Sequence, residues 1–212
     1  GKPVEIIVVN NNSTDRTEAL VKQAGIKCIL EKKQGITAAR NAGLQIASGK
    51  YILNADADTI YPHNWIDAMV TPLQNNNSIA LTYGPFSFIP TANTTRFTYF
   101  LYEFATSLVK LYYKRYKEEA VNVYGFNSCF RREQGLAVEG FNHPLGSNED
   151  GWLALKLRKT GFGKLQKISA NNSSVWTTDR RIQLEGGFLP GVRKRIAKTL
   201  FPHRFTEIRS DL

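Results

Sequence analysis

The sequence predicts an α/β fold in which a mostly parallel sheet carries helices on both faces. Between residues 4 and 88, short β-branched segments alternate with amphipathic segments of helical length, and the links between them are short. Such alternation pairs strands in parallel and places helices over the sheet. With 212 residues, 42% of them hydrophobic, the chain is long enough to bury a substantial core.

Each element of the first half follows from a local pattern. Runs of apolar and β-branched residues that end in turn formers predict strands at residues 4–12, 26–33, 51–58 and 78–88. Helical periodicity predicts helices at residues 12–25, 36–49 and from Pro62 to about Val70. Asn12 or Ser13 is expected to cap the first helix, and Gly25 to end it.

The second half is less regular. Residues 95–116 form a long aromatic segment that predicts a helix lying against the sheet or against a membrane surface. Residues 124–135 predict a strand that runs into a helix, and residues 147–161 predict a capped helix that ends at Gly161. No internal repeat interrupts this order.

The charge balance indicates an anionic partner. The chain has 28 Lys and Arg against 18 Asp and Glu, a net charge of +10, which suits nucleotides, acidic lipids or nucleic acid. Residues 180–212 hold eight basic and three acidic residues, so half of this charge lies in the last sixth of the chain. No nucleic-acid recognition motif accompanies the charge, and we therefore predict no nucleic-acid partner.

Cysteine usage and hydropathy indicate the compartment. Cys28 and Cys129 lie in apolar surroundings without a CxxC motif, which predicts reduced core residues and a cytoplasmic location. No apolar run approaches the roughly 18 residues that would span a bilayer. The chain starts at Gly1, and we expect it to be part of a longer protein.

Asp56 and Asp58 end the third predicted strand and are separated by one alanine. Alternate side chains of an extended chain share a face, so the two carboxylates would point the same way and need a cation beside them. Three hypotheses fit: a site for Mg²⁺ or Mn²⁺, which prefer oxygen ligands; the nucleophile of a haloacid-dehalogenase-like phosphatase; or a solvated turn. The phosphatase is the weaker match, because its motif normally follows the first strand.

Glu149 and Asp150 form a second candidate pair. A carboxylate at the rim of a pocket can take a proton from an attacking hydroxyl group, which makes Asp150 a candidate general base. Ser147 and Asp150 also have the spacing of a capping box, and the helix dipole favours acids in a first turn. Both interpretations stay open on these residues alone.

Polar residues also follow the first two predicted strands. Ligands of open parallel sheets bind at the carboxyl ends of the strands, so Asn10, Asn11 and Gly35 should reach the same rim as the two aspartates. Structural roles compete with this interpretation, since asparagines cap helices and glycine permits a tight turn. Arg180 and Arg181 suit phosphate geometry, although most such pairs are solvated.

Taken together, these motifs resemble the inverting glycosyltransferases of family 2, which have the GT-A fold. The resemblance rests on four segments in the family's order and spacing: EIIVVNNNSTDRT (5–17), KKQGITAARNAGLQIASGKYILNADADT (32–59), NSCFRREQGLAVEGFN (127–142) and NEDGWLALKLRKTG (148–161). Linked in this way, the segments are far more specific than any single motif.

The resemblance implies a UDP-sugar or GDP-sugar donor and the residues that bind it. Asn10 and Asn11 stand where the family often has two aspartates near the nucleoside, and Gly35 matches the glycine of the next loop. Asp56 would lie near the ribose and diphosphate. Asp58 would bind the Mn²⁺ or Mg²⁺ that bridges to the diphosphate.

The resemblance also implies an acceptor side. Asp150 matches the catalytic base, and Glu149 would contact the acceptor. Asn127 falls in the acceptor-side strand. Arg180 and Arg181 resemble a basic pair that meets phosphate.

One departure concerns the start of the fold. The family normally opens with an earlier strand that helps to hold the base, whereas this chain begins at the second strand. We therefore expect residues 1–178 to be an N-terminally incomplete GT-A domain and residues 179–212 to be a basic amphipathic tail. Such a tail either lies on an anionic membrane surface or packs on its own domain.

The predicted function is metal-dependent transfer of a sugar to an acceptor hydroxyl group with inversion. The acceptor would be a saccharide or a lipid-linked molecule in cell-surface polysaccharide or glycolipid synthesis, at the inner face of the membrane. A non-catalytic sugar-nucleotide-binding module is the alternative, favoured by the asparagines at positions 10 and 11 and by the missing strand.

Overall fold

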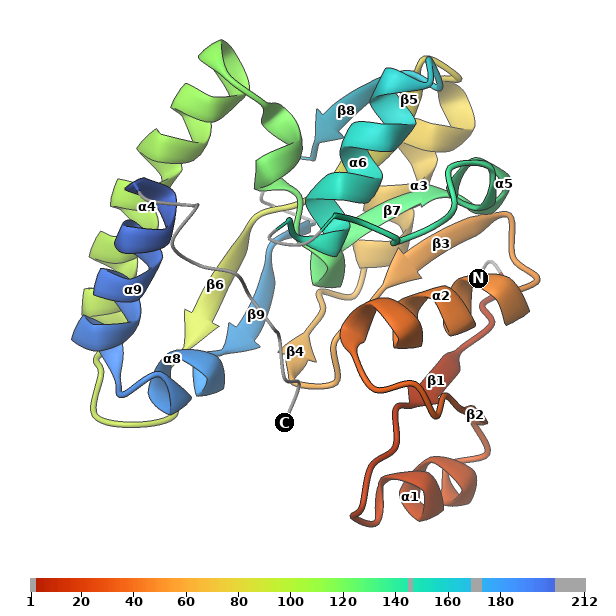
Figure 1. Cartoon of the computed structure of the whole chain (residues 1–212), viewed down its shortest axis with the longest axis horizontal. Coiled ribbons are helices and arrows are strands. Elements are labelled where there is room, and N and C mark those ends of the chain that lie inside the picture. Colours follow the sequence, from red (N-terminus) through yellow and green to blue (C-terminus); the bar gives the residue numbers. More distant parts are fainter. Residues whose placement is uncertain (1–2, 145–146, 169–172, 201–212) are drawn as a thin grey trace.

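The computed structural model describes residues 3–144, 147–168 and 173–200 and shows an α/β fold (Figure 1). The described strands form three sheets. The first pairs β1 (Ile7–Asn10) with β2 (Lys27–Leu30). The second has the order β3 (Tyr51–Asn54), β7 (Ser128–Arg131), β5 (Ile79–Tyr83) and β8 (Lys164–Lys167), and the third has the order β4 (Thr59–Ile60), β9 (Val175–Thr178) and β6 (Phe86–Ile89). The predicted α/β class is confirmed.

Strand pairing is mixed where the sequence predicts mostly parallel strands. The pairs β1–β2, β5–β8 and β6–β9 are parallel, whereas β7 is antiparallel to both β3 and β5, and β4 is antiparallel to β9. Before β7 the chain runs through α4 (Arg96–Tyr116) and two short 3-10 helices, η1 (Glu119–Asn122) and η2 (Gly125–Asn127). After this excursion it re-enters the sheet in the opposite direction, between β3 and β5.

The single strand predicted at residues 78–88 is wrong. It is divided into β5 and β6, which belong to different sheets. Pro85 has no N–H to donate to a ladder. A Cβ atom on Gly84 would lie 2.5 Å from Asn127 Nδ2 and 2.6 Å from the Ser173 carbonyl oxygen. The Gly84–Pro85 pair therefore lets the chain leave one sheet and enter the next.

The predicted helices of the first half are present as α1 (Thr17–Gln23), α2 (Ile36–Ile46) and α3 (Trp65–Asn75). The cap expected at Asn12 or Ser13 is wrong, because the Asp15 carboxylate accepts from the Thr17 N–H at 2.9 Å and α1 begins there. Gly25 follows α1 with φ of 68°, as predicted. In the second half, α5 (Arg132–Ala137) and α6 (Glu149–Lys159) continue the predicted pattern.

The four-stranded sheet separates two apolar clusters (Figure 1). α3 covers one face, where Met69 and Leu73 are fully buried. α5 and α6 lie over the other face, where Phe130, Phe141 and Leu157 are fully buried. Neighbouring residues of a strand point to opposite faces, which explains why Cys129 belongs to the first cluster and Phe130 to the second. Cys129 is a free, buried thiol, as predicted.

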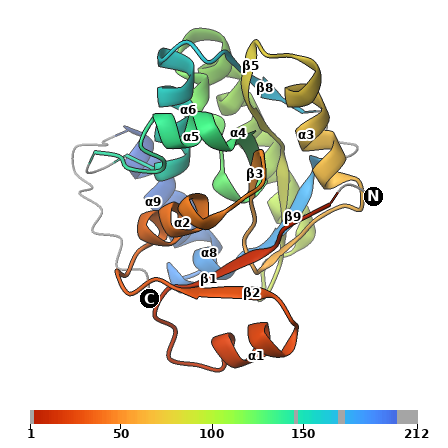
Figure 2. The same ribbon diagram turned by 90° about the vertical axis from the view of Figure 1, so that its right-hand side faces the viewer.

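β1, α1 and β2 form a unit beside the larger sheet (Figure 2). α2 packs on β1 so closely that a Cβ atom on Gly43 would lie 3.3 Å from Val9 Cγ2. Within the described residues β1 pairs only with β2, and β3 only with β7. β1 and β3 therefore each keep an edge without a strand partner in this part of the chain.

Asn127, which the resemblance places on the acceptor side, is a buried framework residue directly before β7. Its side chain is fully buried. Asn127 Oδ1 accepts from Trp65 Nε1 at 2.8 Å, and Nδ2 donates to the carbonyl oxygens of Pro85 and Ser173, each at 2.7 Å. These bonds join α3 to the segments that precede β6 and β9.

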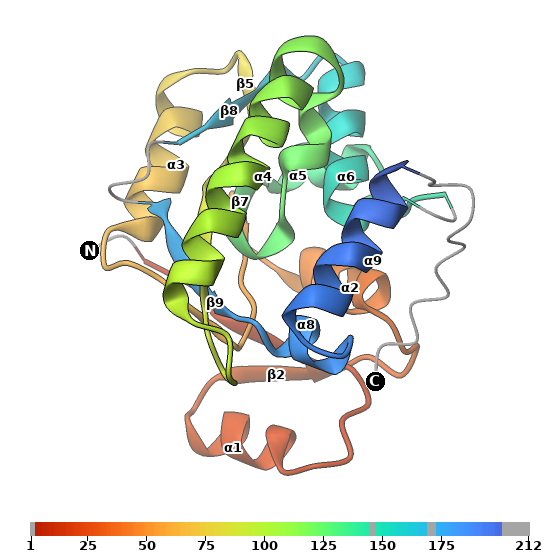
Figure 3. The same ribbon diagram turned by 90° about the vertical axis from the view of Figure 1, so that its left-hand side faces the viewer.

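The start of the predicted tail packs on the rest of the fold. Asp179 is fully buried and accepts hydrogen bonds from Tyr99 of α4 (2.6 Å) and from the Thr91 N–H (2.9 Å). It precedes α8 (Arg180–Leu184) and α9 (Phe188–Leu200), and Phe188 contacts the Tyr99 ring edge-on. Figure 3 shows α9 running beside α4. The remainder of the tail, residues 201–212, lies outside the described residues.

No helix in the described part of the chain is both long and apolar enough to cross a bilayer.

Replacing Asn127 with alanine should lower the free energy of unfolding by about 2–4 kcal/mol, because a buried indole N–H and two buried carbonyl groups lose their partners. Urea titration followed by circular dichroism measures this change. Asn93→Ala, at an exposed loop position, is the control and should change stability by less than about 0.5 kcal/mol. Equal stability of the two variants would show that these bonds do not hold the sheets together.

Candidate active site

A cavity of about 2170 Å³ lies where β1, β3, α2, α4 and α6 meet. Its lining brings together the predicted residues Asp56, Asp58, Glu149, Asp150, Arg180 and Arg181. The other predicted residues, Asn10, Asn11, Gly35 and Asn127, are not part of this lining. The predicted charged residues therefore line the cavity, whereas the predicted asparagines and glycine do not.

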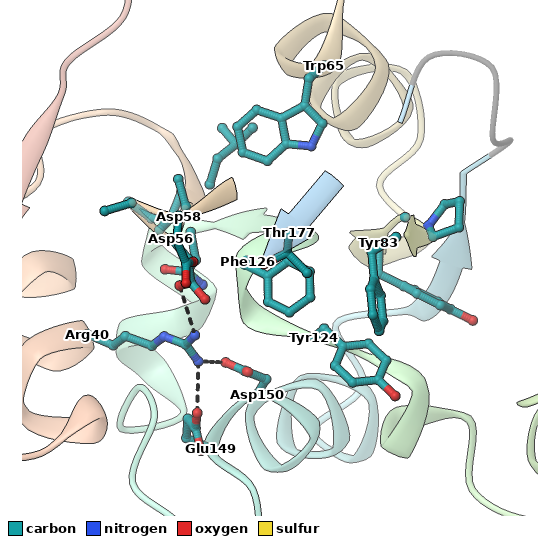
Figure 4. Close-up of a pocket in the computed structure, with 18 of the residues that line it drawn as sticks. Arg40, Asp56, Asp58, Trp65, Tyr83, Tyr124, Phe126, Glu149, Asp150 and Thr177 are labelled. Carbon is teal, nitrogen blue, oxygen red and sulfur yellow. Dashed lines mark hydrogen bonds and ion pairs between the residues drawn. The ribbon is translucent and has the colours of Figure 1, made fainter. Parts of the chain in front are cut away.

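Acidic side chains from two distant segments converge on Arg40 of α2 (Figure 4). Arg40 Nη1 bonds to Asp150 and lies 3.2 Å from Glu149 Oε1, while Nη2 lies 3.8 Å from Asp56 Oδ1. The side chains of Arg40, Glu149 and Asp150 are 10%, 3% and 11% exposed. One largely buried guanidinium thus holds carboxylates that follow β3 and begin α6.

The position of Arg40 depends on two local features. It lies in the middle of α2, four residues after Ile36 at the helix start, so the helix directs its side chain into the cavity. A Cβ atom on Gly125 would overlap the Arg40 guanidinium and displace it from this position. Sequence reasoning missed Arg40; the only indication was a charged residue inside the otherwise apolar and small AARNAG segment.

Asp150 is held at both oxygens. Oδ1 bonds to Arg40, and Oδ2 accepts from the Gly125 N–H at 2.7 Å. Its helix is capped by Asn148, whose Oδ1 accepts from the Gly151 N–H at 2.5 Å. Asn148 therefore caps this helix. The capping role that was the alternative to the catalytic interpretation of Asp150 is not its role here. A carboxylate has about four lone-pair sites, so these two bonds still leave room to accept a proton.

Asp56 and Asp58 lie in the turn between β3 and β4. The Asp56 N–H donates to Tyr61 Oη at 2.9 Å, and that hydroxyl donates to the Phe126 carbonyl oxygen at 3.1 Å. Partial burial raises the pKa of Asp56, against the opposing effect of Arg40. Burial also raises the pKa of Tyr61 to about 12, so this phenol stays a neutral donor. The turn is thus fixed by its backbone, and its carboxylates remain available.

Asp58 is linked to the start of the predicted tail. The Thr178 hydroxyl donates to Asp58 Oδ2 at 2.9 Å, and Arg180 Nη2 lies 3.9 Å from the same oxygen. The Arg180 side chain is 75% exposed, so this ion pair is loose. Arg180 can therefore turn toward an anion that enters the cavity.

The two asparagines stabilise loops beside the cavity. Asn10 is buried, and its Oδ1 accepts from the Ser13 N–H at 2.9 Å. Asn11 donates to the carbonyl oxygens of Glu31 and Lys33, and its Oδ1 accepts from the Gly35 N–H at 2.7 Å. Gly35 has φ of 127°, a conformation that favours glycine. These contacts therefore support the structural role of Asn10, Asn11 and Gly35, which was one of the two interpretations that the sequence allowed.

Arg131 does not line the cavity and is a buried framework residue. Its guanidinium donates to the carbonyl oxygens of Ile79 (2.7 Å), Leu73 (2.5 Å) and Asn76 (3.2 Å). It therefore ties the end of α3 to the start of β5. Arg181 is exposed and lines the cavity.

The aromatic side of the cavity contains a lysine that the sequence did not reveal as functional. Lys110 Nζ lies 4.5 Å from the centre of the Phe86 ring and 5.0 Å from that of Tyr124. Burial lowers the pKa of Lys110 to about 8. Figure 4 shows Tyr83, Tyr124 and Phe126 on this side, away from the carboxylates.

The residues present fit a divalent cation in part. Within the described residues, no cluster of three or more His, Cys, Asp and Glu side chains forms a complete metal site. Asp56 and Asp58 supply the one or two carboxylates with which proteins hold Mg²⁺ or Mn²⁺ when substrate phosphates complete the shell. A diphosphate beside these two carboxylates would add negative charge to the same place, and a divalent cation between them would offset it.

The sequence matches one family model. Residues 1–134 match the model described as Glycosyl transferase family 2. This span is more than half of the chain. It leaves the phosphatase hypothesis for Asp56 without support.

Curated relatives share parts of the chain. An uncharacterized glycosyltransferase of Haemophilus influenzae is 39% identical over 82 residues, which cover 36% of this chain and 25% of that protein. The uncharacterized glycosyltransferase YibD of Escherichia coli is 29% identical over 97 residues, 43% of this chain and 28% of YibD. Glucosyl-dolichyl phosphate glucuronosyltransferase of Haloferax volcanii is 22% identical over 157 residues, 70% of this chain and 49% of that protein. The match therefore spans less than half the length of each of these relatives.

Solved structures confirm the GT-A fold. Glucosyl-3-phosphoglycerate synthase of Mycobacterium tuberculosis, solved with Mn²⁺, UDP and glucosyl-3-phosphoglycerate, has a TM-score of 0.60 at 20% identity, covering 96% of this chain and 70% of that one. The mannosyltransferase PcManGT of Pyrobaculum calidifontis, solved with GDP-Man and Mn²⁺, has a TM-score of 0.59 at 20% identity, covering 91% of this chain and 55% of that one.

Replacing Arg40 with methionine should lower the free energy of unfolding by about 2–4 kcal/mol at pH 7, because it leaves largely buried carboxylates without their cation. The free energy of unfolding of Arg40→Lys should lie between those of the unmodified chain and Arg40→Met. The lysine ammonium is a point charge and cannot bond to several carboxylates as the planar guanidinium does. Urea titration measures both variants. The control is Arg16→Met at an exposed position, and an Arg40→Met variant as stable as this control would refute the role of Arg40.

Proposed function

The chain belongs to glycosyltransferase family 2, and from this premise we propose that it transfers a sugar from a UDP-sugar or GDP-sugar to an acceptor hydroxyl group with inversion at the anomeric carbon. The observation that carries the proposal is the convergence of Asp56, Asp58, Glu149 and Asp150 in one cavity. The donor complexes of the two structural neighbours, with UDP or GDP-Man and Mn²⁺, support the donor class.

Asp150 is the proposed general base. It accepts the proton of the acceptor hydroxyl as the oxygen forms a bond to the anomeric carbon. The bond from that carbon to the diphosphate oxygen breaks, and the electron pair leaves with the nucleoside diphosphate. Attack from the face opposite the leaving group inverts the carbon. Arg40 and the Gly125 N–H fix the orientation of Asp150, which supports catalysis by positioning.

Asp58 is the proposed ligand of Mn²⁺ or Mg²⁺, and Asp56 the proposed contact to the ribose and diphosphate. A divalent cation bound there with the donor offsets the charge of the departing diphosphate. Arg180 and Arg181 are the proposed phosphate contacts, because both line the cavity near Asp58. Glu149 is the proposed acceptor contact.

The acceptor proposed is a saccharide or a lipid-linked molecule in cell-surface polysaccharide or glycolipid synthesis. The dolichyl phosphate in the name of the Haloferax volcanii relative supports a lipid-linked acceptor. Lys110 and the rings beside it offer an apolar wall with cations, since Lys114 and Lys167 also line the cavity, and this suits a lipid-linked phosphate. The proposed location is the cytoplasm, at the inner face of the membrane, with the basic tail of residues 179–212 as its contact.

A non-catalytic sugar-nucleotide-binding module is the second candidate. It is favoured because Asn10, Asn11 and Gly35 do not line the cavity: the side chain of Asn10 bonds within its own loop, and that of Asn11 bonds to the Gly35 N–H. This candidate predicts nucleotide binding without turnover. The two measurements below separate it from the enzyme.

Asp58→Asn should weaken Mn²⁺-dependent binding of UDP or GDP by about tenfold or more, because an amide is a poorer ligand for a hard cation than a carboxylate. Isothermal titration calorimetry with UDP, GDP and their sugars, with and without Mn²⁺, measures this. Asp67→Asn, an acid in the first turn of α3, is the matched control. Nucleotide binding that is absent, or that ignores Mn²⁺, would contradict the proposal.

Asp150→Asn should reduce turnover of the donor sugar at least about 100-fold, because it removes the general base. Release of UDP or GDP in the presence of acceptor extracts measures turnover. The affinity for the nucleotide should change little, which separates loss of chemistry from loss of binding. Undiminished turnover would remove Asp150 as the base, and binding without any turnover in the unmodified chain would favour the non-catalytic candidate.

A further inference from the structure

α4 presents its polar side to the molecule and its apolar side to the solvent. On the inward side, Glu103 accepts from the Phe88 N–H at 2.8 Å, Tyr99 bonds to Asp179, and Lys110 lines the cavity. A surface helix of a globular protein normally has the reverse arrangement, with its apolar stripe facing the core.

The outward side carries a continuous apolar stripe. Its residues recur at spacings of three and four, so they share one face of the helix over about four turns. We name this set the outer stripe: Phe97, Phe100, Leu101, Phe104, Leu108 and Leu111, of which Leu111 also borders the cavity. Each is between 51% and 67% exposed. Soluble monomers rarely expose a contiguous apolar patch of this size unless it binds a partner or a membrane.

The charges around the outer stripe are basic. The only acid within α4 is Glu103, which faces inward. Arg115 and Lys117 are exposed at the C-terminal end of the stripe. A face that combines large apolar side chains with cations, and lacks acids, is complementary to an anionic lipid surface.

We propose that α4 docks on an anionic membrane, with the outer stripe in the interfacial region and the basic residues on the lipid phosphates. A second copy of the chain fits this face less well, because the net charge of +10 and the cationic end of α4 would repel in a self-paired helix. The proposal concerns α4 and not the tail, and it does not depend on the proposed reaction.

Docking through α4 also orients the cavity. Thr106 and Lys110 on the inner side of the same helix line that cavity. A helix is about 10–12 Å across with its side chains. The cavity would therefore lie within roughly one helix diameter of the lipid headgroups.

The test is partition of the full chain onto vesicles in a flotation assay. The vesicles are phosphatidylcholine alone or with about one third phosphatidylglycerol, an anionic surface that attracts basic residues. Leu101→Glu/Leu108→Glu places two acids in the outer stripe. Leu20→Glu/Leu30→Glu is the matched control, because these leucines are 53% and 55% exposed on the β1–β2 side and the change in net charge is the same.

The unmodified chain should bind the anionic vesicles, and the outer-stripe variant should bind at least about tenfold more weakly, since two large apolar side chains no longer insert. The control should lose much less. Arg115→Gln/Lys117→Gln should weaken binding by about fivefold for each charge removed. Circular dichroism confirms that each variant is folded.

Three results would overturn the proposal. The first is the absence of partition onto anionic vesicles. The second is an outer-stripe variant that binds as well as the control. The third is a dimer in sedimentation velocity without vesicles that the outer-stripe variant abolishes, because this would assign the face to a second copy of the chain.

Discussion

The ionic contact between Arg40 and the carboxylates around it is the constraint on which the candidate site depends. Bringing Glu149 and Asp150 to the start of one helix, with Asp56 close by, concentrates negative charge in a poorly solvated place, where like charges repel strongly. A single guanidinium offsets this repulsion only if it reaches all of them. α2 therefore lies against the turn at Gly125, where a side chain would displace the guanidinium. The separation of the carboxylates, and so the position of the proposed base, follows from where Arg40 sits.

Buried polar residues hold the two larger sheets and α4 together beside this contact. Asn127 joins α3 to the segments before β6 and β9, and Asp179 joins β9 to α4. A buried polar group whose bonding capacity is met fixes a geometry more sharply than apolar packing does, because any shift leaves it unpaired. Because Asp179 fixes the end of the short β9, the Thr178 hydroxyl before it can donate to Asp58. The turn that carries Asp58 is thus held from the far end of the chain.

Much of the fold could be predicted because it depends on local patterns, whereas the site depends on contacts between distant segments. β1, α1, β2 and α2 follow from periodicity and turn residues, and the charged residues of the cavity follow from their place after strands and at a helix start. Arg40 was missed because nothing in its helix shows that two acids more than 100 residues later will meet it. The framework bonds of Asn127 could not be predicted for the same reason, since only the packed structure reveals that its amide is fully buried. The reversal of β7 depends on the path of α4, which no strand pattern records.

The acids of the cavity and the basic outer surface attract counterions of opposite sign. The chain carries +10 overall, yet the acids of the cavity outnumber the arginines that contact them. A cation would stabilise an anionic donor that binds beside these acids, whereas the basic outer surface attracts anions without one. α4 lies at the boundary between these regions, because it turns Lys110 inward and the outer stripe outward. Because α4 exposes its apolar side, it lacks the stabilisation that burial would supply. This orientation therefore has a cost in free energy in the isolated chain. That cost is recovered only where an apolar surface covers the stripe, and the basic residues at its end determine that this surface is anionic.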